Sequence, residues 1–218
     1  MKEANDYDRA VSRFLAYLQD QRHVSTQTLR AYVSDLAQFR AVLSERHGER
    51  LPGPEAIDAL AIRGFVARLH KEGLAKASVA RKLSAVRSFL KHAVRLGVID
   101  VSPAEGIPTP KQSKLLPKHL TVDEVFTLLD SIAGDDVAAR RDKALLEFLY
   151  ATGLRVGELV SLDLDDVDHS GGLVRVLGKG NKERIVPFGR KAQASLLLWL
   201  HASEPLRRLR QAGARHLL

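Results

Sequence analysis

The chain has 218 residues, 45% of them hydrophobic, which is enough for one large or two small domains, and we expect two. It contains no Cys, which excludes disulfides and thiolate metal sites and favours a reducing cytosol. No apolar run approaches the length of a membrane span, and the first residues, MKEANDYDR, are too polar for a signal peptide. We therefore expect a soluble, cytoplasmic protein.

The positive charge is concentrated in one segment. The chain has a net charge of +8, and residues 62–99 hold nine Lys or Arg but a single acid, Glu72, so this segment accounts for the whole excess. Such a segment favours a polyanionic partner, although many basic proteins bind nothing in particular.

The first hundred residues show helical hydrophobic spacing in four stretches. The first stretch runs from Tyr7 to about Gln19. N-caps of the other three are predicted at Ser25 or Thr26, at Asp58 and at Ser78. Glycines that end these three helices follow at Gly48, Gly73 and Gly97.

The fourth stretch predicts a helix with two different faces. Apolar side chains gather on one side, at Val79, Leu83, Val86, Leu90, Ala93 and Val94. Basic and small hydroxyl side chains gather opposite, at Arg81, Ser84, Ser88, Lys91 and Arg95. Most stripes of this kind are only solvated, but this one has no interleaved acids, and Ser beside Arg suits phosphate. The predicted DNA-binding residues are Arg30, Arg81, Lys82, Ser84, Arg87, Ser88, Lys91, Arg95, Lys111 and Lys114.

A proline-rich and lysine-rich stretch separates the two halves of the chain. Residues 107–118 include Pro108, Pro110 and Pro117, a composition that resists helix and sheet alike. We predict a domain at 1–106, a linker at 107–118 that lies along a DNA backbone or is simply solvated, and a second domain at 119–218.

The second half predicts two helices that lead to a short third one. Thr121 and Glu124 have the spacing of a capping box. The next helix runs from about Asp136 to Tyr150, and Gly153 ends its pattern. Arg155 then opens a short helix in which Glu158, three residues on, lies on the same face.

A basic β-hairpin follows the short helix. Leu173–Leu177 is rich in β-forming residues, residues 178–181 can turn, and residues 185–186 can return, so Lys179 lies at or near the tip. One further helix is predicted at about 191–200. An Arg fixed beside a helix and a Lys on a hairpin suit a phosphodiester whose charge grows during reaction, because Arg binds two phosphate oxygens and Lys can deliver a proton.

Taken singly, these features have simpler interpretations. An Arg at a helix start is usually solvated or paired with a nearby Glu, and a Lys in a Gly-rich turn is usually just a hairpin tip. A nucleotide-binding loop is excluded, because five residues separate Gly172 from Gly178 and Gly180 stands where Ser or Thr should follow the Lys.

The combined stretch ATGLRVGELVSLDLDDVDHSGGLVRVLGKGNKERIVP closely resembles the start of the catalytic domain of tyrosine recombinases, in particular the bacterial Xer type. The stretches STQTLRAYVSDLAQF and SVARKLSAVRSFLKHAVRLG resemble the core-binding domain of the same family. The resemblance implies a mainly α chain, with a four-helix, SAM-like core-binding domain followed by the first part of a mixed α+β catalytic domain. Arg155 then matches the first catalytic Arg, Glu158 the supporting acid and Lys179 the hairpin Lys.

The same resemblance implies site-specific DNA recombination through a phosphotyrosine link, as in chromosome-dimer resolution. The chemistry requires neither ATP nor a metal, because the covalent link retains the bond energy. The implied partners are a duplex recombination site and a second recombinase subunit, in a tetramer on DNA.

Family members continue with a His and Arg cluster and the nucleophilic Tyr, which have no match here. Tyr7, Tyr17, Tyr32 and Tyr150 all precede the motif, so no nucleophile is assigned and we expect these 218 residues to be inactive alone. A non-catalytic DNA-binding chain that occupies recombination sites, or a piece of a longer recombinase, remains the alternative. An RNA-binding helical protein is disfavoured, because aromatic content is only 6%.

Overall fold

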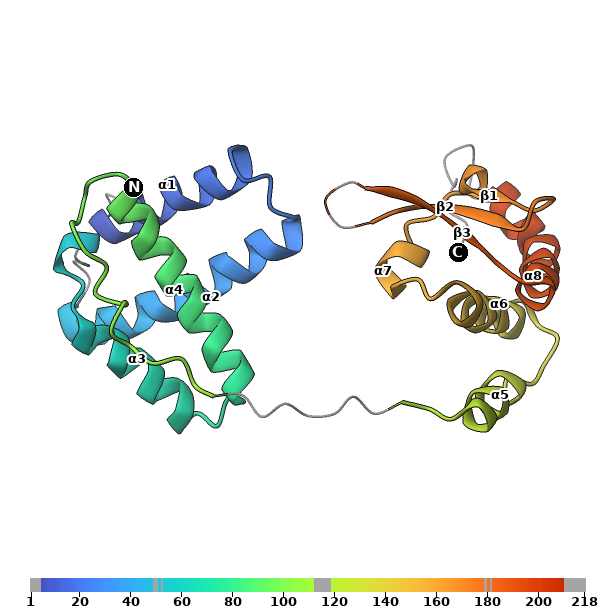
Figure 1. Cartoon of the computed structure of the whole chain (residues 1–218), viewed down its shortest axis with the longest axis horizontal. Coiled ribbons are helices and arrows are strands. Elements are labelled where there is room, and N and C mark those ends of the chain that lie inside the picture. Colours follow the sequence, from blue (N-terminus) through green and yellow to red (C-terminus); the bar gives the residue numbers. More distant parts are fainter. Residues whose placement is uncertain are drawn as a thin grey trace. The chain divides into compact units, whose positions relative to one another are not determined.

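A computed structural model describes residues 5–48, 51, 53–111, 119–178, 180 and 182–209. The chain forms two compact units, residues 1–116 and 117–218 (Figure 1). Each unit has its own hydrophobic core. None of the helices in the described ranges is long and apolar enough to cross a membrane.

The first unit is a four-helix bundle. Its elements are α1 (Asp6–Asp20), α2 (Thr26–His47), the 3-10 turn η1 (Pro54–Ala56), α3 (Ala59–Lys71) and α4 (Lys76–Arg95). Ser25 and Asp58 cap α2 and α3 as predicted, since their side chains accept the N–H groups of Thr28 and Ala61.

The core of the first unit is aromatic, and α4 packs against the other three helices. Phe14 and Phe89 meet edge to face with ring centroids 5.8 Å apart, and Phe39 and Phe65 do so at 5.2 Å. Such contacts add to the stabilisation from apolar burial. The predicted inner face of α4 is confirmed, because Val79, Leu83, Val86 and Leu90 are fully buried.

The beginning of α4 differs from the prediction. The helix starts at Lys76 with Ala75 as its N-cap and no side-chain cap, so Ser78 lies inside the first turn. Gly73, at φ 76°, ends the preceding helical segment. Because only Leu74 and Ala75 connect Gly73 to Lys76, α4 begins before Ser78.

The second unit combines helices with a small antiparallel sheet. Its elements are α5 (Val122–Asp130), α6 (Val137–Thr152), α7 (Val156–Leu159), η2 (Leu164–Asp166), β1 (Val167–Asp168), β2 (Leu173–Leu177), β3 (Glu183–Pro187) and α8 (Arg190–Leu209). The strands lie in the order β1-β2-β3, and Arg184 pairs with Val176 across the hairpin. The helices α6 and α8 pack together, and Phe148, Val174 and Leu196 belong to the shared core.

The mainly α architecture with a small hairpin is confirmed, as is the capping box at Thr121. The helix predicted from about Asp136 to Tyr150 is α6, and Asp136 is its N-cap. Two details were not predicted. The two-residue strand β1 is too short to show an alternating pattern. Helix α8 continues to Leu209 instead of ending near Leu200, with Pro205 inside it.

Candidate active site and DNA-binding face

Arg155 is positioned by the end of α6. Gly153 adopts a left-handed conformation, φ 63°, and its N–H bonds to the carbonyl of Leu149 at 2.9 Å, which closes the helix. The next residue, Leu154, is buried, and Arg155 after it is the N-cap of α7. The guanidinium of Arg155 is mostly in solvent, with its side chain 78% exposed.

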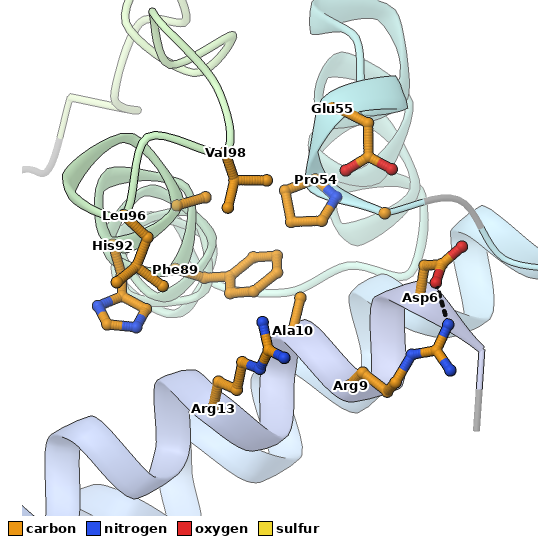
Figure 2. A pocket seen from close by; sticks show the side chains of 12 residues that line it. Asp6, Arg9, Ala10, Arg13, Pro54, Glu55, Phe89, His92, Leu96 and Val98 are labelled. Atoms are coloured by element: carbon orange, nitrogen blue, oxygen red, sulfur yellow. Dashed lines mark hydrogen bonds and ion pairs between the residues drawn. The ribbon is translucent and has the colours of Figure 1, made fainter.

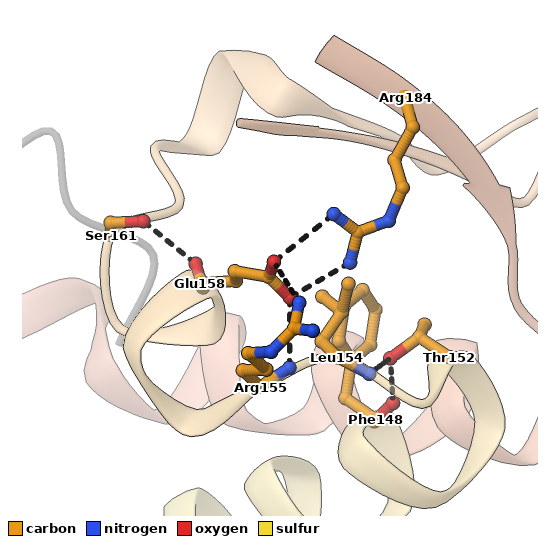
Figure 3. Close-up of polar contacts among 7 residues, drawn as sticks. All are labelled: Phe148, Thr152, Leu154, Arg155, Glu158, Ser161 and Arg184. Carbon is orange, nitrogen blue, oxygen red and sulfur yellow. Dashed lines mark hydrogen bonds and ion pairs between the residues drawn. The ribbon is translucent and has the colours of Figure 1, made fainter. Parts of the chain in front are cut away.

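Glu158 holds Arg155 at two points (Figure 3). One carboxylate oxygen, Oε2, accepts the backbone N–H of Arg155 at 2.9 Å, and the other, Oε1, accepts its Nη1 at 3.1 Å. Arg184 from β3 donates to the same two oxygens, at 2.8 Å to Oε2 and 3.1 Å to Oε1. The prediction that Glu158 lies on the same face as Arg155 is therefore confirmed.

These bonds keep Glu158 ionised. The hydrogen bond from Arg184, followed by that from the Arg155 backbone, lowers the pKa of Glu158 to about 2. The same pair raises the pKa of Arg184. Glu158 is thus a fixed anion and not a group that exchanges protons near neutral pH.

A cavity of about 430 Å³ lies beside Arg155, lined by Arg155, Gly157, Glu158, Ser161, Leu177 and Gly178. Its lining residues come from the start of α7 and from the end of β2, where the predicted hairpin turn begins. Lys179 and Lys114 lie outside the described residues. Within the described ranges, no group of three or more His, Asp or Glu residues could hold a metal ion.

The outer face of α4, defined by Arg81, Ser84, Ser88, Lys91 and Arg95, is more varied than predicted. Ser84 and Lys91 are exposed. Arg95 is also exposed and donates to the Tyr17 hydroxyl at 2.7 Å. Ser88 is half-buried and accepts from the Tyr32 hydroxyl at 3.3 Å.

A buried acid from α2 neutralises part of the charge on α4. Asp35, 2% exposed at its side chain, accepts two bonds from Arg81 and one from Lys82 at 2.9 Å. Lys82 is 8% exposed at its side chain and has no surface to offer a phosphate. The sequence pattern predicted Lys82 as a DNA contact because α4 itself contains no acid, but the acid that pairs with Lys82 comes from α2.

The remaining predicted DNA-binding residues differ in their freedom. Arg87 is half-buried and bonds to the Ile107 carbonyl and to Thr109, which ties α4 to the chain that leaves the first unit. Arg30 and Lys111 are exposed. A separate cavity of about 180 Å³ lies between α1, η1 and the end of α4, and Arg9, Arg13 and His92 are among its lining residues (Figure 2).

Sequence reasoning missed two residues that organise these sites, Arg184 and Asp35. Arg184 follows the turn in GKGNKER, and an even spacing from Val186 places both on one side of β3. That spacing was the signal available in the sequence. Asp35 carried no such signal, because its partners are more than forty residues away.

A four-helix unit followed by an α+β unit, with an Arg and Glu pair beside a β-hairpin, defines an integrase type of fold. The model of the phage integrase N-terminal SAM-like domain matches residues 11–97, and that of the phage integrase family matches residues 118–214. The chain belongs to this family, the tyrosine recombinases.

Among curated relatives, the tyrosine recombinase XerC of Azotobacter vinelandii is 46% identical over 187 residues, which are 86% of this chain and 62% of the relative. XerC of Pseudomonas fluorescens is 42% identical over 202 residues, which are 93% of this chain and 65% of the relative. The chain therefore spans slightly less than two thirds of the length of these relatives.

Solved structures share the fold. One is XerH recombinase bound to a palindromic difH substrate, a post-cleavage complex, with a TM-score of 0.72 at 18% identity. The match covers all of this chain and 74% of the XerH chain. A lambda integrase tetramer bound to a Holliday junction has a TM-score of 0.65 at 20% identity and covers 90% of this chain and 56% of its own.

Proposed function

We propose that this chain takes part in site-specific DNA recombination, in which strands are cut and rejoined through a phosphotyrosine link. The observation that carries the proposal is the Arg155 guanidinium, exposed beside a cavity and anchored by a fixed anion. The family and the relatives named XerC support the same reaction. Its proposed setting is chromosome-dimer resolution before cell division. We propose that the reaction takes place in the cytoplasm, because its substrate would be chromosomal DNA.

Each residue has a distinct proposed role. Arg155 binds the scissile phosphate and stabilises the negative charge of the transition state. Lys179 donates a proton to the leaving 5′ oxygen, since a neighbouring phosphate keeps the ammonium protonated. Glu158 holds Arg155 in place through the two bonds described above. The tyrosine that attacks phosphorus is not assigned within residues 1–218.

The outer face of α4 is the proposed contact with the DNA backbone, with Lys91 and Arg95 as its principal cations. Both are exposed, whereas the charge of Arg81 is shared with Asp35. Arg30, Ser84, Ser88, Arg87, Lys111 and Lys114 are proposed as additional contacts. We propose further subunits of the same family as partners, because lambda integrase is described as a tetramer on a Holliday junction.

DNA binding is tested by fluorescence anisotropy with a duplex at several salt concentrations. Replacing Lys91 and Arg95 with Ala should reduce the slope of log affinity against log salt by about two units, because each phosphate contact contributes roughly 0.9. The matched control is Arg9→Ala with Arg13→Ala, which removes the same charge from the exposed surface of α1. Equal slopes in both double variants would show that the outer face is merely solvated.

Catalysis is tested with a nicked suicide substrate that traps a covalent adduct. Residues 1–218 alone should give none, because Arg155 and Lys179 stabilise charge and move a proton but supply no nucleophile. Joining the C-terminal segment of a curated relative should give an adduct that Arg155→Ala abolishes and Lys179→Ala slows. An adduct from the 218 residues alone, mapped to one of their tyrosines, would contradict the assignment.

A further inference from the structure

Arg184 occupies half of the hydrogen-bonding capacity of Glu158. A carboxylate offers about four lone-pair positions. Two are filled by the backbone and guanidinium of Arg155, at 2.9 and 3.1 Å, and two by the fork of Arg184, at 2.8 and 3.1 Å (Figure 3). The carboxylate is therefore saturated, with no position left for a second bond from the Arg155 side chain.

This arrangement sets the charge that Arg155 presents to the cavity. Glu158 is nearly buried, with its side chain 9% exposed, so it needs a compensating cation. With Arg155 alone, the pair would be neutral and the guanidinium would turn toward both carboxylate oxygens. With Arg184 present, the three groups together carry a net positive charge, and four of the five N–H donors of Arg155 are not used on Glu158.

Gly178 makes room for this contact. A Cβ at this position would lie 2.9 Å from Nη1 of Arg184 and 3.8 Å from Oε1 of Glu158. The N–H of Gly178 bonds to the carbonyl of Lys182 at 2.8 Å, so its backbone is held at the mouth of the turn. The absence of a Cβ at Gly178 thus leaves space for the tip of Arg184 beside Glu158.

We propose that Arg184 is a positioning residue that neutralises Glu158 and thereby leaves Arg155 available as a cation for a phosphate. The proposal rests on the phosphate-binding role of Arg155 in the proposed function. Arg184 acts through Glu158 and does not itself contact the reacting atoms. Its removal should convert Arg155 from a phosphate ligand into the counter-ion of Glu158.

The test titrates the 218-residue chain with inorganic phosphate and follows the Arg155 Nε–Hε signal by NMR, assigned by its loss in Arg155→Lys. The wild type should show a saturable shift. Arg184→Gln should weaken phosphate binding by roughly ten-fold, the effect of about one screened charge at close range near a protein surface. Arg184→Lys, which keeps the charge but loses the fork, should fall between the two.

Two matched variants separate charge balance from other effects. Arg175 lies in the same sheet but pairs with Asp166 and not with Glu158. Arg175→Gln is therefore a control, and it should bind phosphate as the wild type does. The double variant Glu158→Gln with Arg184→Gln removes the anion as well, so it should recover phosphate binding relative to Arg184→Gln. A residue needed only to hold the hairpin in place would give no such recovery.

The outcomes are distinguishable. Wild-type affinity in Arg184→Gln, or a double variant as weak as Arg184→Gln, overturns the role of Arg184 while the wild-type phosphate response remains. Absence of any wild-type response refutes the phosphate role of Arg155, and with it the proposed function. Should Arg184→Gln unfold the second unit, Arg184→Lys, which keeps the charge but loses the fork, must still weaken phosphate binding relative to the wild type or the proposal fails.

Discussion

Replacing Asp35 with Ala should destabilise the first unit strongly, because it strands the buried ammonium of Lys82. The two side chains are only 2% and 8% exposed, and their atoms are 2.9 Å apart. Arg81, the other partner of Asp35, is 53% exposed at its side chain and can return to water. The loss therefore falls mainly on Lys82.

The magnitude follows from that division. Removing one partner of a buried ion pair costs about 3–5 kcal/mol, because the other charge is left uncompensated. Since Arg81 relaxes into solvent, we expect the lower end, about 3 kcal/mol in the free energy of unfolding. For a unit of this size, that corresponds to a fall in the melting temperature of roughly 10–15 °C.

The assay combines circular dichroism with tryptophan fluorescence. The chain has a single Trp, Trp199, which lies in α8 of the second unit. Its fluorescence transition should stay unchanged in Asp35→Ala, while the helical signal of the first unit melts earlier. The fluorescence thus serves as an internal control within the same sample.

A double variant sharpens the test. Asp35→Leu combined with Lys82→Met should recover most of the lost stability, because a buried ion pair can often be replaced by apolar side chains at little cost. An unchanged melting temperature in Asp35→Ala, or a double variant no better than the single one, would refute the reasoning.

Three further predictions concern the second unit and the boundary between the units. The lowered pKa of Glu158 stabilises the second unit fully above about pH 4.5, and this contribution is lost as the pH falls toward 2; Glu158→Gln should flatten that decline in Trp199 fluorescence. Thr121→Ala should lower the free energy of unfolding by about 1 kcal/mol in urea titrations, because it removes the capping box of α5, whereas the exposed Thr127→Ala should cost less. Limited proteolysis should first cut between residues 107 and 118 and release a stable helical fragment, since the units have separate cores; early cuts within residues 6–95 would contradict this.

Local chemistry made much of the fold predictable. The side chains of Ser25, Asp58 and Asp136 accept backbone N–H groups three residues on, and Gly153 turns the chain into Arg155. These features depend on neighbours within one helical turn, so the sequence order itself shows them. The α4 start was not predictable in this way, because the short connection outweighed the capping preference of Ser78.

The site was predictable only where its residues are close in sequence. Arg155 and Glu158 are three residues apart and meet as expected. Arg184 reaches Glu158 from 26 residues away, and Asp35 reaches Lys82 from 47. Whether such residues meet depends on strand register and helix packing, which hydrophobic periodicity does not specify.

The pairing of β2 with β3 also limits where the hairpin tolerates a change in length. Along β3, Arg184 and Val186 are half-buried, while Ile185 is 68% exposed. An insertion between Gly178 and Lys182 leaves Arg184 opposite Val176. Loss of one residue within β3 would turn Ile185 inward and Arg184 outward, because side chains alternate between faces. We therefore expect changes of length to be tolerated in the turn but not in β3. Only a change within β3 moves the Arg184 side chain to the other face of the sheet.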